Sequence, residues 1–220
     1  MCGRFTLFAA PEAIQAEFDL ADVPANLAPR YNIAPTQAVA VIANNVERRL
    51  DFFQWGLIPA WAQDPSIGSR MINARAETLA DKPAFRAALR KRRCLILTNG
   101  FFEWRKDNGS KTPFFIYLRS GRPFALAGLW EVWQTPDGVA LPTCTIITTG
   151  PNSLMATLHD RMPVILAPEA YDRWLDPAPQ APTDLTPLLV SYPAEAMALH
   201  AVARVVNSPA HDSPACIEPA

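Results

Sequence analysis

The second residue of the chain, Cys2, could carry covalent chemistry. Removal of the initiator Met1 would leave Cys2 with a free α-amine and a thiol on neighbouring carbons. The unperturbed amine has a pKa of about 8 and the thiol of about 8.5, so part of the amine is neutral at cellular pH. Such an amine forms a Schiff base with an aldehyde, and the thiol can then close a five-membered thiazolidine ring. By itself, a cysteine at this position assigns no function.

A carboxylate in an aromatic segment is the second candidate. In an extended strand, alternation places Glu103 on the side opposite to Phe102 and Trp104. Burying an ionised carboxylate among aromatic rings is costly. Glu103 therefore faces water, pairs with an arginine, or has a raised pKa that suits acid–base catalysis.

Two further polar groups could bind or protonate a substrate. His159, one of three histidines, precedes an aspartate and an arginine, and could be a general acid or a helix cap. Asn73 and Arg75 share one face of an extended segment, where an amide and a guanidinium suit a phosphate or a sugar oxygen. A salt bridge from Arg75 to an acid such as Glu77 is the alternative.

The composition restricts the class of protein. The chain has 220 residues, 50% of them hydrophobic, and 20 Lys plus Arg against 21 Asp plus Glu, for a formal net charge of -1. It predicts a globular, cytoplasmic protein without a membrane span or secretory signal. A polyanion site would have to come from a local cluster of arginines. The four cysteines lack any C-x-x-C spacing, so we expect reduced thiols and no metal site.

The elements that position these residues are mostly strands. Helices are expected at 11–20, 82–93, 153–158 and 168–175, and the basic run Arg90 to Arg93 would end the second of them at the negative end of its dipole. We expect one α+β domain over residues 1–220, with a hairpin turning at Asn44-Asn45, an antiparallel meander over 94–149, and a turn at Asn108-Gly109. The strands are predicted at 4–8, 39–43, 46–55, 94–98, 101–105, 113–118, 124–133, 142–149 and 201–206.

Six segments occur in the order typical of one known family. These segments are Cys2-Gly3-Arg4-Phe5, Tyr31-Asn32-Ile33-Ala34-Pro35, Trp55-Gly56-Leu57-Ile58-Pro59-Ala60-Trp61, Ile72-Asn73-Ala74-Arg75-Ala76-Glu77-Thr78, Gly100-Phe101-Phe102-Glu103-Trp104 and His159-Asp160-Arg161-Met162-Pro163. Over nearly its whole length the sequence therefore resembles the SRAP domain proteins, the SOS-response-associated peptidase family. That resemblance implies a compact α+β fold with a barrel-like, mostly antiparallel sheet core, short flanking helices and a basic groove.

The resemblance also implies a reaction. Cys2 would crosslink to the ring-opened aldehyde of an abasic site in single-stranded DNA and shield the lesion during the SOS response. Glu103 would transfer protons and assist autocatalytic release of Met1, a hydrolase activity. His159 would open the deoxyribose for lyase-like Schiff-base chemistry, and Asn73 would position the amine or the sugar. No cofactor is implied, and we expect a monomer that joins the nucleoid through DNA. The candidate DNA-binding residues are Arg4, Pro35, Trp61, Arg75, Thr148 and Arg161.

Two other functions fit parts of the sequence. Glutamine amidotransferases of the N-terminal nucleophile type also begin with a mature Cys-Gly, but they need a four-layer αββα sandwich and give Glu103 and His159 no role. A noncatalytic single-stranded DNA binder would use the arginines and aromatic residues and make Cys2 dispensable. In either DNA-binding case, Trp61 and Trp104 could stack on bases, while core packing is the alternative for Trp104.

Overall fold

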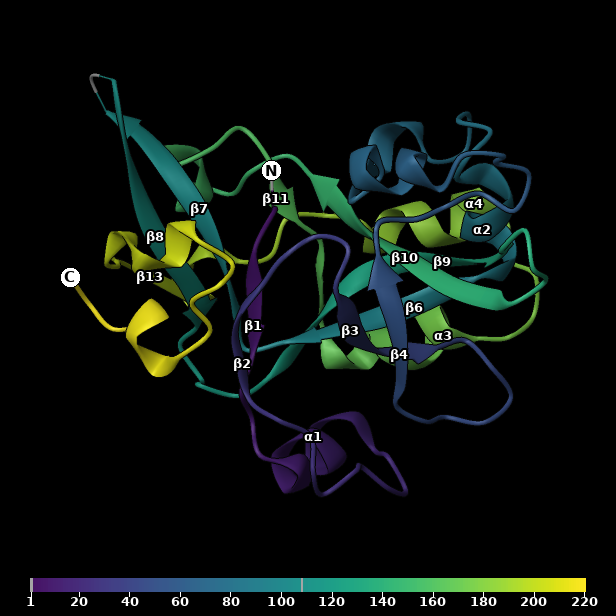
Figure 1. Ribbon diagram of the computed structural model, residues 1–220, viewed down its shortest axis with the longest axis horizontal. Coiled ribbons are helices and arrows are strands. Elements are labelled where there is room, and N and C mark those ends of the chain that lie inside the picture. Colours follow the sequence, from purple (N-terminus) through teal and green to yellow (C-terminus); the bar gives the residue numbers. More distant parts are fainter. Residues whose placement is uncertain (1, 108) are drawn as a thin grey trace.

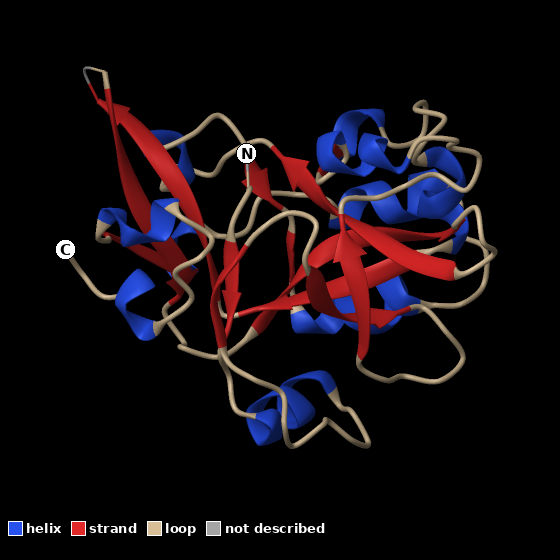
Figure 2. Cartoon of the chain, in the orientation of Figure 1, coloured by secondary structure: helices blue, strands red, loops and turns tan. Residues whose placement is uncertain are grey.

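Two β-sheets with short helices around them make up the computed structural model, which describes residues 2–107 and 109–220 (Figures 1 and 2). The expected release of Met1 and the first half of the Asn108-Gly109 turn lie outside the described residues. Among those described, no helix is long and apolar enough to cross a membrane.

The first sheet has five strands, and every neighbouring pair in it is antiparallel. The amino-terminal strand lies inside this sheet, so residues at the start of the chain are fixed on both sides. In spatial order the strands are β13 (Met197–Ala201), β8 (Ser110–Leu118), β7 (Gly100–Asp107), β1 (Phe5–Leu7) and β2 (Arg30–Ile33).

The second sheet contains a closed barrel. Its path runs β10 (Ala140–Thr149), β4 (Asp51–Trp55), β3 (Ala38–Ala43), β6 (Arg93–Thr98) and β9 (Phe124–Gln134). The barrel closes because β9 also pairs with β10. Only the β10–β4 pair of this ring is parallel. The predicted α+β fold with a barrel-like, mostly antiparallel core is thus confirmed.

Short elements decorate the barrel and the first sheet. Strands β5 (Asn73–Arg75) and β11 (Met162–Pro163) pair with β10, and β12 (Ile165–Leu166) pairs with β9. The α-helices are α1 (Pro11–Phe18), α2 (Arg86–Lys91), α3 (Tyr171–Leu175) and α4 (Pro182–Leu185). The 3₁₀-helices are η1 (Pro65–Arg70), η2 (Ala76–Thr78), η3 (Met155–Thr157), η4 (Pro168–Ala170), η5 (Thr186–Leu188), η6 (Ala194–Ala196), η7 (Arg204–Asn207) and η8 (Pro214–Cys216).

The predicted helix over 82–93 is too long at both ends. Residues 83–85 form a turn, and α2 covers only Arg86–Lys91. Arg93 begins β6 and is completely buried. Its guanidinium donates to the carbonyls of Trp174 (2.8 Å), Leu89 (3.1 Å) and Arg90 (2.7 Å), which satisfies a buried cation without a carboxylate. The last residue of the basic run is therefore a core residue.

Three strand predictions also need correction. The predicted hairpin forms, because β3 pairs antiparallel with β4, but its connection runs over residues 44–50 instead of the two residues Asn44-Asn45. The buried Asn44 amide bonds to the ends of α2 and β6. The last strand ends at Ala201, and residues 204–207 form a 3₁₀-helix. The meander is divided, with β7 and β8 in the first sheet and the other strands in the barrel.

One tryptophan ties the two sheets together beside the amino terminus. Trp55, at the end of β4, is fully buried and packs edge-on against Phe5 of β1 with ring centroids 5.0 Å apart. Its indole N–H donates to the carbonyl of Ile72 at 2.9 Å. Because Ile72 precedes β5, this contact sets the position of β5 relative to β1.

Candidate active site

The amino-terminal residues run along β7 toward Glu103. Phe5 pairs with Phe101, and the Phe102 N–H donates to the Arg4 carbonyl at 2.9 Å, so the antiparallel path continues beyond β1. Cys2 is fully buried, and Glu103 is only 3% exposed. The sheet therefore places the candidate nucleophile next to the candidate acid–base residue.

The surroundings of Cys2 keep its thiol protonated. Burial, together with the negative charge of Glu103, raises the pKa of the Cys2 thiol to about 12. The Sγ atom makes a weak contact, at 3.9 Å, with the Arg4 carbonyl. A thiol held in this way needs a base before it can attack.

Asn73 holds the backbone of Cys2. Its Nδ2 donates to the Cys2 carbonyl at 2.8 Å. Its Oδ1 is buried and has no hydrogen-bond partner among the described residues. Asn73 thus joins β5 of the barrel sheet to the amino terminus of the first sheet, and still offers an acceptor there.

The next polar residues follow from the pairing of β5 with β10. Thr148 lies opposite Arg75 in the parallel register, and Arg161 donates to the Thr148 carbonyl at 2.6 Å. Arg161 also forms a two-pronged ion pair with Glu77, at 2.7 and 2.9 Å, whose hydrogen bonds lower the pKa of Glu77. The salt bridge to Glu77 that the sequence suggested for Arg75 is formed by Arg161 instead. Arg75 is exposed, and its guanidinium makes no ion pair with the described residues.

Arg4 lies against the carboxy-terminal part of the chain. Its NH1 donates to Asn32 Oδ1 at 2.6 Å and to the Val206 carbonyl at 2.8 Å. The guanidinium carbon lies 5.9 Å from the ring centre of Trp104. Burial lowers the pKa of Arg4. One of its two terminal nitrogens is thus occupied by the fold.

His159 faces a cleft of about 760 Å³. The cleft is also lined by Trp104 and Arg105 of β7. The His159 Nδ1 lies 3.0 Å from the Arg161 backbone nitrogen and 2.8 Å from an Asp160 oxygen. A neutral ring can accept from Arg161 or donate to Asp160 through that nitrogen, but not both. Acceptance from Arg161 leaves a proton on Nε2, which suits a hydrogen-bond donor or general acid.

The two remaining sequence candidates are not joined to this group by the contacts of the described residues. Trp61 is 63% exposed, in a loop held by a 2.7 Å hydrogen bond from Trp133 Nε1 to the Ala62 carbonyl. Pro35 lies in the turn between β2 and β3. The described contacts join neither of them to Cys2, so both stay predictions.

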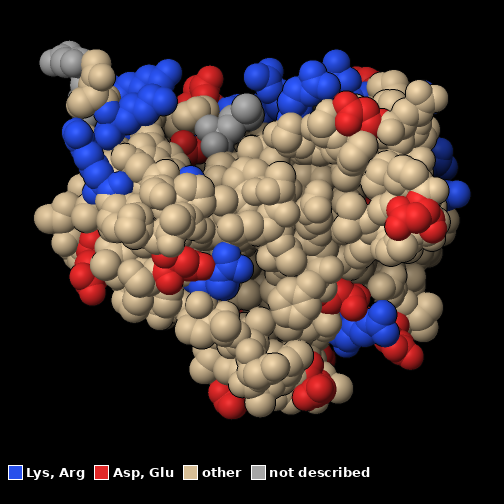
Figure 3. Space-filling model, viewed as in Figure 1, with Lys and Arg blue, Asp and Glu red and all other residues tan. Residues whose placement is uncertain are grey.

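Positive charge gathers on both sides of the amino terminus. Figure 3 shows Lys and Arg atoms along one edge of the molecule, in one group on the β7–β8 hairpin and another over the short helices η1 and η2. The amino-terminal end of β1 lies between the two groups (Figure 1). Exposed cations in these regions are Arg70, Arg75, Lys82, Arg105, Lys106 and Lys111. The local clustering expected for a polyanion site is therefore present in a chain of net charge -1.

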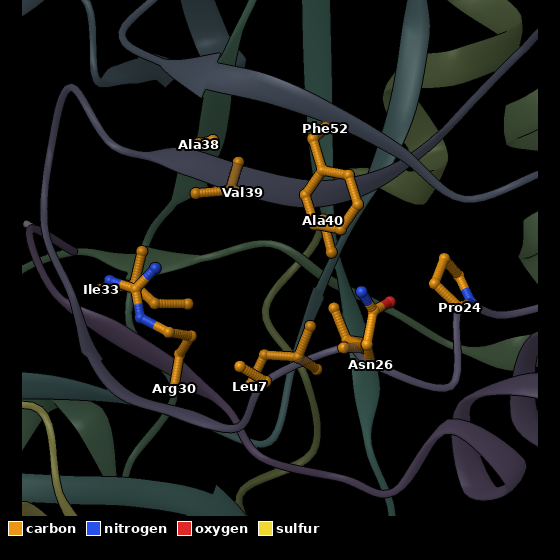
Figure 4. Close-up of a pocket in the computed structure, with 11 residues that line it drawn as sticks. Leu7, Pro24, Asn26, Arg30, Ile33, Ala38, Val39, Ala40 and Phe52 are labelled. Atoms are coloured by element: carbon orange, nitrogen blue, oxygen red, sulfur yellow. The ribbon is translucent and has the colours of Figure 1, made fainter.

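Other parts of the molecule offer less chemistry. An apolar groove of about 430 Å³ lies between β1, β2, β3 and β4, lined by Leu7, Val39 and Phe52 among others (Figure 4). Its arginine, Arg30, is paired with Asp212. Burial raises the thiol pKa of Cys94 and of Cys144, as expected for inert core cysteines. No group of three or more His, Cys, Asp or Glu among the described residues could hold a metal ion.

Several supporting residues escaped the sequence reasoning. Asn32 and Trp55 lie inside the quoted segments, but no role was assigned to either of them. Glu77 was considered only as a partner of Arg75. Asn207, which accepts a 2.7 Å hydrogen bond from Trp104, directly follows the predicted strand 201–206 and carried no signal.

The geometry and the sequence together define a family. The family model described as SOS response associated peptidase (SRAP) matches residues 1–209. The chain belongs to this family.

Individual relatives are similar over most of the chain. It is 48% identical over 222 residues to the abasic site processing protein YoqW of Bacillus subtilis, covering 99% of both chains. It is 34% identical to the abasic site processing protein HMCES of Gallus gallus, covering 87% of this chain and 66% of that protein. A crystal structure of a protein from Bacteroides thetaiotaomicron superposes with a TM-score of 0.90 at 29% identity over 100% of both chains.

Proposed function

We propose that this protein captures abasic sites in single-stranded DNA as a covalent adduct of Cys2. The observation that carries the proposal is the placement of Cys2: its carbonyl is held by Asn73 at 2.8 Å, and its thiol lies within the electrostatic reach of Glu103. Membership of the SRAP family, and the names of the relatives YoqW and HMCES, point to the same lesion.

The reaction begins once Met1 is removed, because until then the Cys2 nitrogen is an amide. The neutral α-amine adds to the aldehyde of the opened sugar, and loss of one water gives an imine. The thiol then adds across the C=N bond, so that a C–S bond forms and the nitrogen gains a proton. The ring closes without any other leaving group, and the same steps in reverse release the DNA.

Glu103 would carry protons between these steps. The thiol pKa of about 12 means that the amine, rather than a thiolate, attacks first. In the second step Glu103 would accept the thiol proton and return it to the nitrogen. General acid–base assistance of this kind contributes about 10²- to 10⁴-fold in rate. The same carboxylate near the Met1–Cys2 bond is the candidate for autocatalytic release of Met1.

Asn73 and His159 have separable roles in this scheme. The buried Oδ1 of Asn73 can accept a hydrogen bond from the freed amine and aim it at the aldehyde. His159, in the cleft beside Trp104, would protonate the ring oxygen as the closed sugar opens. An open-chain aldehyde would bypass the need for His159.

The DNA strand would follow the cationic edge. Arg75 offers a free guanidinium next to Asn73, and the cations of the β7–β8 hairpin lie on the other side of the amino-terminal end of β1. Binding through several phosphates would weaken as salt rises, because condensed counterions are released.

The test is a denaturing gel of protein incubated with an oligonucleotide that carries one abasic site. Protein with a mature Cys2 should give a shifted band that survives denaturation, and Cys2→Ala should give at most a labile imine. A stable adduct from Cys2→Ala, or from protein with a blocked amino terminus, would rule out the ring mechanism. Binding without any adduct from the mature protein would favour the noncatalytic DNA binder. The closed barrel already argues against the four-layer sandwich of the amidotransferases.

A further inference from the structure

One turn near the carboxy terminus holds two side chains of the site. In η7, the Val206 carbonyl accepts a hydrogen bond from Arg4 at 2.8 Å. The next residue, Asn207, accepts one from the Trp104 indole N–H at 2.7 Å through its Oδ1. Arg4 and Trp104 also contact each other, with the guanidinium over the ring.

The turn itself is fixed to β2. The fully buried Asn32 donates through its Nδ2 to the carbonyls of Val206, at 3.2 Å, and of Ser208, at 3.0 Å. The Asn32 backbone N–H donates to Asp212 at 2.9 Å. Because η7 cannot move freely, the acceptor that it offers to Trp104 has a defined position.

The Trp104 ring forms a wall of two clefts. One is the cleft of about 760 Å³ that His159 faces, and the other, of about 240 Å³, is lined by Trp104, Lys111 and Asn207. The ring is only partly buried, so packing alone does not fix it. The hydrogen bond to Asn207 therefore sets the shape of the surface next to His159.

We propose that Asn207 is a positioning residue for DNA: it locks the Trp104 indole in the orientation that receives a base beside the lesion. This inference rests on the proposed function, since the ligand is taken to be single-stranded DNA. Stacking on an indole suits any unpaired base, because every base has a π face. The described contacts of Asn207 reach neither Cys2 nor Glu103, so we expect it to act on strand binding and not on the covalent steps.

The experiment uses the full chain and an undamaged, labelled single-stranded oligonucleotide, whose dissociation constant is measured by fluorescence anisotropy. The variants are Asn207→Leu, which loses the acceptor, Trp104→Phe, which loses the donor but keeps a ring, and the double variant. Ser208→Ala is the matched control, because it is exposed on the same turn and uses only its backbone in the contacts above. Maximal crosslinking rates at saturating protein are measured in parallel with an abasic oligonucleotide.

Asn207→Leu should weaken binding about fivefold, the usual effect of losing one neutral hydrogen bond. In the Trp104→Phe background, Asn207→Leu should weaken binding little further. The maximal crosslinking rate of Asn207→Leu and the dissociation constant of Ser208→Ala should stay at wild-type values. An unchanged dissociation constant for Asn207→Leu overturns the inference, as does an equal loss in the Trp104→Phe background, which would show that Asn207 merely supports the turn. Wild-type protein that does not bind the oligonucleotide overturns it as well.

The two proposals fail in different ways. If the mature wild-type protein forms no stable adduct while Asn207→Leu weakens binding through Trp104, the ring mechanism is wrong and the positioning role stands. If the adduct forms but the anisotropy series shows no coupling between Asn207 and Trp104, only the positioning role is wrong.

Discussion

Replacing Asn73 by leucine tests whether the backbone of Cys2 must be held for the reaction. The change keeps a side chain of similar size and removes the 2.8 Å hydrogen bond to the Cys2 carbonyl. Because Cys2 is fully buried, that carbonyl would be left without a partner. A buried unsatisfied group costs about 1–3 kcal/mol. If the amino terminus relieves this cost by leaving its position, the fraction of molecules in which Cys2 is held for the reaction falls about 5- to 150-fold.

The measurement is single-turnover crosslinking to abasic single-stranded DNA, with protein in excess. We expect Asn73→Leu to slow adduct formation within that range, while noncovalent affinity for undamaged DNA changes little. Asn44→Leu is the matched control, because Asn44 is a buried asparagine whose hydrogen bonds hold α2 and β6 and involve none of the candidate site residues. It should lower the melting temperature and leave the crosslinking rate at 25 °C unchanged. A wild-type rate for Asn73→Leu would refute the positioning of Cys2 by this amide.

A pH profile and three substitutions test separate features. The crosslinking rate of the wild type should rise with pH through the amine pKa, which is about 8 when unperturbed. It should show no second rise below pH 9, because the thiol pKa is about 12. Glu103→Gln should slow adduct formation and reversal together by about 10²- to 10⁴-fold, and unequal effects on the two directions would contradict a shared proton carrier. Glu77→Gln removes the anion paired with Arg161. It should therefore strengthen binding to undamaged single-stranded DNA and steepen the salt dependence of that binding by about 0.7 in logarithmic slope. Weaker binding would mean that Glu77 orients Arg161 for the strand. Gly100→Ala would place a Cβ 2.5 Å from the Phe115 ring and 2.6 Å from the Ile116 carbonyl. This overpacking should lower the free energy of unfolding by about 1–3 kcal/mol and the melting temperature by about 2–12 °C. The control Gly150→Ala, which has open space around it, should change the melting temperature little.

The strands around the site could be predicted because their patterns are local. Alternation in the segment after Gly100 correctly separated Phe101 from Phe102 and Trp104, which lie in two different apolar clusters. The barrel was expected only from the family resemblance; the strand patterns alone could not predict its closure, because closure depends on β9 pairing with both β6 and β10. No periodicity in one strand encodes two partners.

Helix ends and buried charges were harder to predict, because they depend on partners that are distant in the sequence. The run of cations at residues 90–93 predicts a solvated helix end, but the fold uses the last of them, Arg93, to bind backbone carbonyls inside the protein. One of these partners, Trp174, is 81 residues away from Arg93 in the sequence. Likewise, the link from Arg4 to Val206 joins ends of the chain that no local pattern connects.

The contact between Arg4 and Val206 also has a consequence for synthesis. The two residues are 202 positions apart. At about 5–20 residues per second, a ribosome needs about 10–40 s between them. During that interval the nascent amino terminus exists without the turn that anchors Arg4. Late removal of Met1 would keep the amine masked from free cellular aldehydes until translation has supplied its surroundings.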